Sequence, residues 1–230
     1  MEVHNVLRDL KSLANPTNKE GMAQFGINTQ KALGISVVDL RKLATHIGKK
    51  HNLALKLWDT GYHEARILAS MIDEPGLVSE KQMEAWVKDF NSWDLCDQCC
   101  MNLFSHSKLA YKKAIEWSSK DKEFVKRAGF TLMACMAVKS RKAKDFAFIR
   151  LLPIIKRESR DERNYVKKAV NWALRQIGKR SLNLNKKALK TAEEILQLDS
   201  KSAKWIATDA IRELESEDVL KRLAGQIKKY

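Results

Sequence analysis

Apolar residues recur along this chain at the three- and four-residue spacing of an amphipathic helix. In the first segment, residues 2–14, the positions Val3, Val6, Leu10 and Leu13 fall on one helical face. Asn-Pro-Thr-Asn at 15–18 interrupts this first pattern. The period-two alternation that predicts a strand is essentially absent. The pattern therefore predicts an all-α protein.

Turn-forming residues separate the apolar segments from one another. Ser36 and Ser79 each stand where a helix cap is expected, and Asp39, three residues after Ser36, is placed as its acidic partner in the first helical turn. Loops are predicted at 26–34 and, rich in basic residues, at 139–144. The predicted helices span 2–14, 19–25, 37–47, 53–59, 63–71, 80–90, 93–104, 108–118, 121–138, 145–157, 161–178, 185–197, 200–214 and 216–228.

A short sequence pattern, called the repeated phrase, recurs at equivalent positions of five predicted helices. Its central residue is charged or polar, and the centres are Arg66, Asp97, Arg127, Lys168 and Thr208. The steps between centres, about 31, 30, 41 and 40 residues, are typical of stacked helical hairpins. The repeat predicts one domain over 1–230, a right-handed or C-shaped α-solenoid, with the phrase centres in a line along one face.

The positive charge is concentrated in the middle and later repeats. The formal net charge is +15, and residues 108–190 hold 24 Lys and Arg against 7 Asp and Glu, whereas the rest of the chain holds 19 against 21. Such a block attracts polyanions, of which nucleic acid is the commonest large one. A solubilising surface is the plainer alternative.

The sequence contains no predicted membrane span and no signal peptide. No apolar run approaches the roughly 20 residues of a spanning helix, and the N-terminus lacks the apolar core of a signal sequence. A cytoplasmic location (bacterial cytosol or nucleoid) or a nuclear one is therefore expected, without membrane association.

One carboxylate stands out within the repeated phrase. Asp97 lies in an apolar segment, one helical turn after Trp93, so the two side chains share a face. A carboxylate in such a place needs a partner or a chemical role. It is either an ion-pair partner of a neighbouring repeat, with Arg66 or Arg127, or a functional group.

Basic residues and a tryptophan form a second pattern on the later repeats. Lys168, Trp172 and Arg175 follow the i, i+4, i+7 spacing of one helical stripe, and Lys167 lies on the same helix. Lys126 and Arg127 open the preceding repeat helix. Such stripes can neutralise phosphates and pack against sugars or bases; Trp172 as a core residue is the alternative. Four further tryptophans lack repeated basic partners and are predicted to be core or edge packing: Trp58, Trp86, Trp117 and Trp205.

The cysteines predict neither a metal centre nor a redox motif. Cys96-x-x-Cys99 has no second pair at zinc-ligand spacing and no βαβ setting. We therefore expect no metal and no cofactor.

The motifs around Trp93 and Trp172 resemble those of the AlkD-type DNA alkylation repair glycosylases, which are built from HEAT-like helical repeats. The likeness covers most of the chain. It is strongest in Ser-Trp-Asp-Leu-Cys-Asp97, in Lys126-Arg127-Ala and in Val-Lys-Lys-Ala-Val-Asn-Trp172-Ala-Leu-Arg175, with Phe-Gly-Ile at 25–27 also fitting. The resemblance implies an enzyme, a monofunctional DNA N-glycosylase that removes N3- or N7-alkylated purines from duplex DNA bound in a basic concave surface.

The resemblance also implies roles for individual residues. Asp97 matches the catalytic aspartate, with Trp93 and Trp172 as the two tryptophans of the cleft. Arg127 matches an arginine that holds the lesion-bearing backbone, and DNA contacts are expected from Lys126, Lys167, Lys168, Arg175, Arg66, Phe25 and Tyr165. Phe25 stands where founding members have tyrosine, and Asn164 and Tyr165 stand where they have two phenylalanines. A monomer is expected.

Two other functions fit the same residues. A nucleic-acid-binding repeat protein without catalysis predicts salt-sensitive binding and no base release. A protein-interaction scaffold for an acidic partner predicts that nucleic acid fails to bind at moderate salt.

Overall fold

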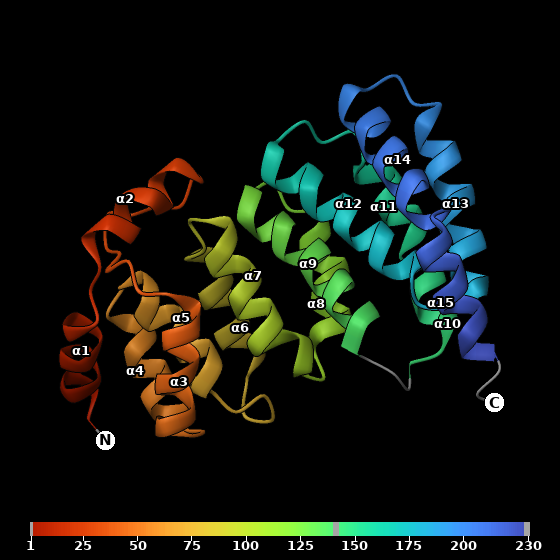
Figure 1. Cartoon of the computed structure of the whole chain (residues 1–230). Coiled ribbons are helices and arrows are strands. Elements are labelled where there is room, and N and C mark those ends of the chain that lie inside the picture. The colour runs from red at the N-terminus through yellow and green to blue at the C-terminus, as the bar shows by residue number, and fades with distance from the viewer. Residues whose placement is uncertain (1, 140–142, 228–230) are drawn as a thin grey trace. The chain divides into compact units, whose positions relative to one another are not determined.

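The computed structural model describes residues 2–139 and 143–227, which fold into α-helices joined by short loops (Figure 1). The all-α prediction is confirmed over these residues. Residues 140–142 of the predicted basic loop, and residue 228 at the end of the last predicted helix, lie outside them. No described helix has the length and apolarity to cross a membrane.

The chain divides into two compact units at residues 109 and 110. The helices of the first unit are α1 Val3–Ser12, α2 Pro16–Gln24, α3 Val37–Ile47, α4 His51–Asp59, α5 His63–Ile72, α6 Glu80–Lys88, α7 Trp93–Asn102 and the short 3₁₀ helix η1 Phe104–His106. Within this unit α5 is central, since it packs against α1, α3, α4 and α7.

The second unit repeats one arrangement of paired helices. Its helices are α8 Ala110–Ser118, α9 Glu123–Lys139, α10 Asp145–Ile149, α11 Leu152–Glu158, α12 Asn164–Gly178, α13 Leu182–Leu196, α14 Lys201–Leu214 and α15 Glu217–Ile227. The longest helices form its interior, because α9 packs against α8 and α12, and α12 packs against α13 and α14.

Contacts between neighbouring hairpins recur at fixed sequence separations, as a repeat structure requires. In the first unit the partners are 31 residues apart, as in His63–Asp94 and Trp58–Asp89. In the second unit they are 38 apart, as in Asn171–Asp209 and Arg175–Glu213. Residues one repeat apart therefore meet across the hairpin boundaries inside each unit.

The structure corrects which residue of α14 is equivalent to the centres of the repeated phrase in the other helices. Arg66 lies three residues after the first residue of α5, and Asp97, Arg127 and Lys168 lie four residues after the starts of α7, α9 and α12. At the 38-residue separation of the second unit, Lys167 corresponds to Trp205 and Lys168 to Ile206, so Thr208 lies two residues beyond the equivalent position. Contacts between α12 and α14 fix this register, which the sequence pattern alone does not establish.

Two proline positions account for differences from the predicted helices. Pro16 opens α2, where its missing N–H costs no hydrogen bond, and the Asn15 side chain caps the helix by accepting from Asn18 N. The predicted helix 145–157 is wrong: it is split into α10 and α11. Pro153 cannot continue a helix through residues 149–153, so it stands in the first turn of α11 instead.

Tryptophans fill the interior of both units. Trp58 and Trp86 stack with ring centroids 3.9 Å apart, beside Phe90 and Phe104, and Trp117 is fully buried in the second unit. These three are core residues, as predicted. Trp205 is 42% exposed and belongs to neither core.

Candidate functional site

The start of α7 is fixed by a carboxylate that is not Asp97. The Ser92 hydroxyl donates to Asp94 Oδ1 at 2.7 Å, and His63 Nε2 of α5 lies 2.8 Å from Asp94 Oδ2. Burial raises the pKa of Asp94, but the hydrogen bonds with His63, Ser92 and the Leu95 amide outweigh burial and hold that pKa below its ordinary value. Asp94 is thus ionised at neutral pH and ties α7 to α5.

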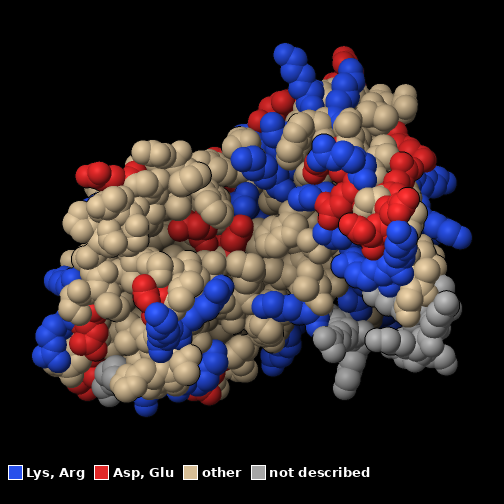
Figure 2. Space-filling view, in the orientation of Figure 1, with Lys and Arg blue, Asp and Glu red and all other residues tan. Residues whose placement is uncertain are grey.

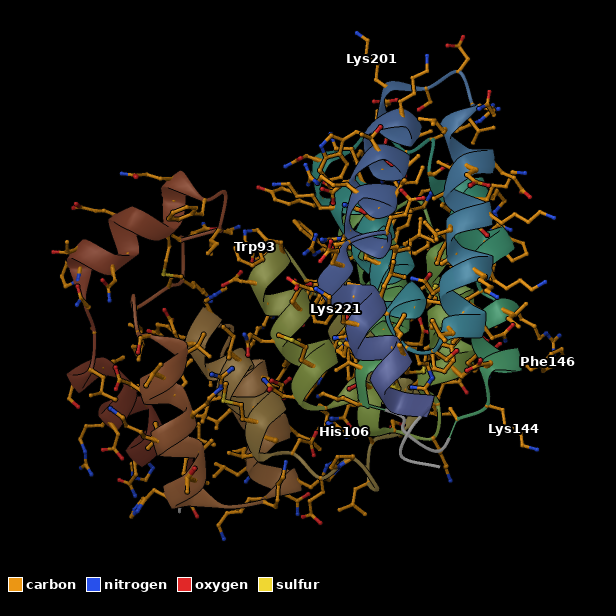
Figure 3. All side chains as sticks on the ribbon, turned by 45° about the vertical axis from the view of Figure 1, so that its right-hand side comes forward. Trp93, His106, Lys144, Phe146, Lys201 and Lys221 are labelled. Atoms are coloured by element: carbon orange, nitrogen blue, oxygen red, sulfur yellow. The ribbon has the colours of Figure 1, made fainter. Side chains whose placement is uncertain are left out.

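Trp93 joins α7 to a segment far away in the sequence. Its indole Nε1 donates to the carbonyl oxygen of Phe25 at 3.0 Å, across a separation of 68 residues. Phe25 directly follows α2 and is 71% exposed. The structure therefore brings together two of the residues selected from the sequence, Phe25 and Trp93. Figure 3 shows Trp93 at the first turn of α7.

A cavity of about 550 Å³ opens beside this contact, inside the first unit. Its wall is mostly apolar, with hydroxyl and amide groups at some positions; it consists of Thr17, Asn18, Gly21, Met22, Phe25, Ile27, Gly34, Ile35, Ser36 and Trp93. Cavities of this size accommodate small organic groups, and aromatic walls offer stacking surface. A purine or an alkyl group is small enough to enter.

A buried carboxylate holds one wall of the cavity in place. Glu64 of α5 is 1% exposed and accepts hydrogen bonds from the backbone N–H groups of Leu33, Gly34 and Ile35 at 2.7–3.3 Å. Gly34 has φ +79°, and a Cβ there would lie 2.0 Å from the carbonyl oxygen of Asn15. Only glycine fits, so this loop is fixed both by charge and by shape.

Asp97 lies in the second turn of α7, four residues after Trp93. It is 8% exposed, and the neighbouring Leu95, Cys96 and Cys99 are fully buried or nearly so. The alternative partner Arg66 is committed elsewhere: its guanidinium donates to the Asp89 carboxylate at 3.0 Å and lies 5.3 Å from the centre of the Trp58 ring. A pairing of Arg66 with Asp97 is therefore wrong, and so is the expectation that Trp58 lacks a cationic partner.

The cysteines around Asp97 are core residues. Cys96, Cys99, Cys100 and Cys135 are all described and all buried. Burial, with Cys96 and Asp73 nearby, raises the pKa of the Cys99 thiol well above its ordinary value, so the metal-binding thiolate form is disfavoured there.

The second unit carries the positive charge. Residues 110–230 contain 30 Lys and Arg against 15 Asp and Glu, whereas residues 1–109 contain 13 of each. On the face shown in Figure 2, both signs occur over α13–α15, and many lysines and arginines project outward. The net charge of +15 belongs entirely to this unit.

Several basic residues selected from the sequence make interactions inside the unit. Lys126 Nζ lies 2.7 Å from Glu158 and 3.2 Å from Asp161, and Arg175 pairs with Glu213 and Asp209. Arg127 is 6% exposed and donates to the carbonyl oxygen of Tyr165 at 2.6 Å, which joins α9 to the first turn of α12. These cations hold neighbouring hairpins together.

The remaining selected residues lie closer to the solvent. Lys168 is exposed and Trp172 is half-buried, so Trp172 is not one of the fully buried core tryptophans. Lys167 Nζ lies 5.1 Å from the centre of the Trp205 ring. The expectation that Trp205 lacks a basic partner is wrong. The separation of 38 residues between Lys167 and Trp205, the same as between Asn171 and Asp209, is the signal that could have identified this pair.

The comparisons with known proteins agree with this arrangement. The family described as DNA alkylation repair enzyme matches residues 6–214. A solved structure described as "A new family of proteins related to the HEAT-like repeat DNA glycosylases with affinity for branched DNA structures" has 20% sequence identity and a TM-score of 0.76, over 92% of this chain and 95% of that chain. A comparison with curated proteins finds no match.

The structural similarity confirms the predicted fold of HEAT-like helical repeats. The family match extends over nearly all the helices, from α1 to α14, and includes every candidate residue named above. This chain belongs to the DNA alkylation repair enzyme family.

Proposed function

We propose that this protein is a monofunctional DNA glycosylase that excises N3- or N7-alkylated purines from duplex DNA. The observation that carries the proposal is the construction of α7, which presents Trp93 at the wall of an aromatic cavity and Asp97 one turn later. Family membership supports a DNA repair enzyme, and the basic second unit supports a DNA substrate.

The proposed chemistry requires only one carboxylate. A purine alkylated at N3 or N7 is already cationic, so it leaves without protonation by a general acid. As the bond between C1′ and the purine breaks, its electron pair neutralises the base and positive charge develops on the deoxyribose. The Asp97 carboxylate stabilises this charge, orients a water toward C1′ and accepts the proton that the water releases.

The aromatic residues have a complementary role in this proposal. An electron-rich ring face attracts a cation within about 6 Å, and tryptophan is the strongest such ring. Trp93, held in place by the Phe25 carbonyl, would favour the cationic base over its neutral counterpart. Phe25 and Met22 would supply apolar contact along the same wall.

The basic residues of the second unit would contact the DNA backbone. Lys168 is exposed and free to meet a phosphate, whereas Lys126 and Arg175 would first have to exchange their carboxylate partners. The Arg127 guanidinium is largely buried, so its contribution would be to position the start of α12 as well as to attract a phosphate.

Release of methylated purines from duplex DNA tests the proposal. The wild-type protein is incubated with duplex containing N3-methyladenine and N7-methylguanine, beside Asp97→Asn and the matched variant Asp59→Asn, which removes an exposed carboxylate from α4. We expect release by the wild type and by Asp59→Asn, and a large loss in Asp97→Asn. No release by the wild type, or equal release by all three, contradicts the proposal.

A second function, DNA binding without catalysis, is favoured by one observation. Asp97 is only 8% exposed, which limits its access to a substrate sugar. The related solved structure is described as having affinity for branched DNA structures. This function predicts salt-dependent binding that prefers branched over linear DNA, with no base released from either.

A further inference from the structure

Trp205 has a setting that packing does not explain. It lies on α14 and is 42% exposed, whereas Trp58, Trp86 and Trp117 are at most 4% exposed. Lys167 of α12 places its Nζ 5.1 Å from the ring centre, within cation–π distance. Much of the ring area thus remains open to solvent, beside a positive charge.

The repeat register gives this residue a second distinction. Trp205 lies 38 residues after Lys167, the separation at which Asn171 meets Asp209 and Arg175 meets Glu213, so it is the α14 equivalent of Lys167. In the repeat of α12 this position supplies Lys167, one of the proposed DNA contacts. In the last of these repeats it supplies an exposed aromatic ring.

Polar and basic groups surround the ring on its own helix. Lys201 lies one turn before Trp205 and Thr208 about one turn after it, so both share its face. Lys204 and Lys168 are also exposed. Figure 3 shows Lys201 projecting into the solvent at one end of the second unit. Lys167, Lys168, Lys201, Lys204, Trp205 and Thr208 are called the α14 patch below.

The carboxylates that border the α14 patch do not cancel its charge. Glu162 accepts from Ser200 Oγ at 2.8 Å and from the Ser202 amide at 3.1 Å, and these bonds, with Lys167 and Lys201 nearby, lower its pKa. Asp199 lies 4.0 Å from Lys204. Asp209, one turn after Trp205, is ion-paired with Arg175 and Arg212. The four lysines of the patch therefore outnumber the remaining carboxylates Glu162 and Asp199, a balance that suits a phosphate backbone.

We propose that the α14 patch binds an unpaired stretch of a DNA strand, with one base stacked on Trp205 and the adjacent phosphates on Lys167 and Lys201. An aromatic ring among cations is the usual means of binding single strands, because every base has a stacking face. Paired bases have their faces covered by neighbours, so the ring discriminates for unpaired ones. This inference rests on the proposed function and specifies the form of DNA that the second unit recognises.

Fluorescence of 2-aminopurine tests the inference. The base analogue is placed in a short single-stranded gap of a duplex, and the same sequence fully paired is the reference. The full-length protein is compared with Trp205→Ala, Trp205→Phe and Lys167→Ala. The matched control is Lys144→Ala, which removes an exposed lysine at the other end of the unit (Figure 3).

For the wild type we expect quenching in the gap and about tenfold tighter binding of the gapped DNA than of the paired DNA. Trp205→Ala should lose both while it keeps its affinity for paired DNA, and Trp205→Phe should retain part of each. Lys167→Ala should weaken binding of gapped DNA more than Lys144→Ala does. Thermal unfolding confirms that the variants are folded.

Three results overturn the inference. If Trp205→Ala keeps the preference for gapped DNA, Trp205 is not the platform, although the glycosylase proposal stands. If an acidic peptide of equal charge displaces gapped DNA as well as competing DNA does, the patch recognises charge alone. If the wild type binds neither DNA, both this inference and the proposed function fail.

Discussion

At the scale of single residues, Gly21 offers the sharpest probe of the cavity beside Trp93. It lies within α2 at the cavity wall, and a Cβ built there meets nothing within 4 Å. Gly21→Ala should raise the free energy of unfolding by about 0.5–1 kcal/mol, because glycine inside a helix is entropically unfavourable. Urea unfolding measures this gain.

The larger variant Gly21→Leu then tests what the cavity does. Gly21→Leu should fold as stably as the wild type. Because its side chain adds bulk at the cavity wall, its release of methylated purines should fall severalfold. Gly21→Ala should release them normally. Unchanged release by Gly21→Leu would show that the lesion does not use this cavity.

At the scale of helices, Asp94 connects α5 to α7 in a pH-dependent way. Its pKa is lower in the folded protein than in the unfolded chain, so the unfolded chain binds the proton more tightly. The stabilisation is therefore complete above the unfolded-state pKa, about 4, and is lost as the pH falls through the lower folded-state pKa.

Comparison of the wild type with Asp94→Asn isolates this contribution. The difference in their free energies of unfolding should be largest near pH 7 and should shrink progressively below about pH 4. Urea titrations at several pH values measure it. A difference that stays constant from pH 7 to pH 3 would contradict the role assigned to the Asp94 carboxylate.

The contacts between hairpins predict opposite effects for two lysines. Lys126, 11% exposed at its side chain, bridges α9 to Glu158 and Asp161, whereas Lys168 on α12 is exposed. Lys126→Ala should destabilise the protein by about 3 kcal/mol, because it leaves carboxylates without their cation. Lys168→Ala should leave stability unchanged and weaken DNA binding. The reverse outcome would reject this assignment.

The sequence predicted helices well where caps and breakers were unambiguous, as at Ser36 and Ser79. It failed at Pro153, where one predicted helix is two. It also misplaced the last repeated phrase by two residues, which concealed the equivalence of Trp205 with Lys167. Apolar periodicity repeats each turn, so only the observed contacts between helices fix the register.

The candidate site was predictable only in part, because many of its contacts join segments that are distant in the sequence. Trp93 and Asp97 share a helical face, which the spacing alone establishes. The contact of Trp93 with Phe25, the Glu64 carboxylate under residues 33–35 and the ion pairs of Lys126 join segments 29 to 68 residues apart. Pairings at such distances depend on how hairpins pack, which local pattern does not encode.

At the scale of the whole molecule, charge and candidate chemistry are divided between the two units. The first is electrically neutral by residue count and contains Asp97, whereas the second holds the whole net charge of +15. Lys168→Ala should therefore lower the slope of log affinity against log salt concentration by about 1. Lys88→Ala, an exposed lysine of the first unit, should leave the slope unchanged.

The central claim is that the Asp97 carboxylate performs chemistry on DNA. Its most direct test is the single-turnover rate of base release from an N7-methylguanine duplex, with protein in excess so that binding does not limit the rate. We predict a loss of about 100-fold or more in Asp97→Asn, with DNA affinity unchanged. Equal rates for the two proteins, or no release by the wild type, would contradict the claim.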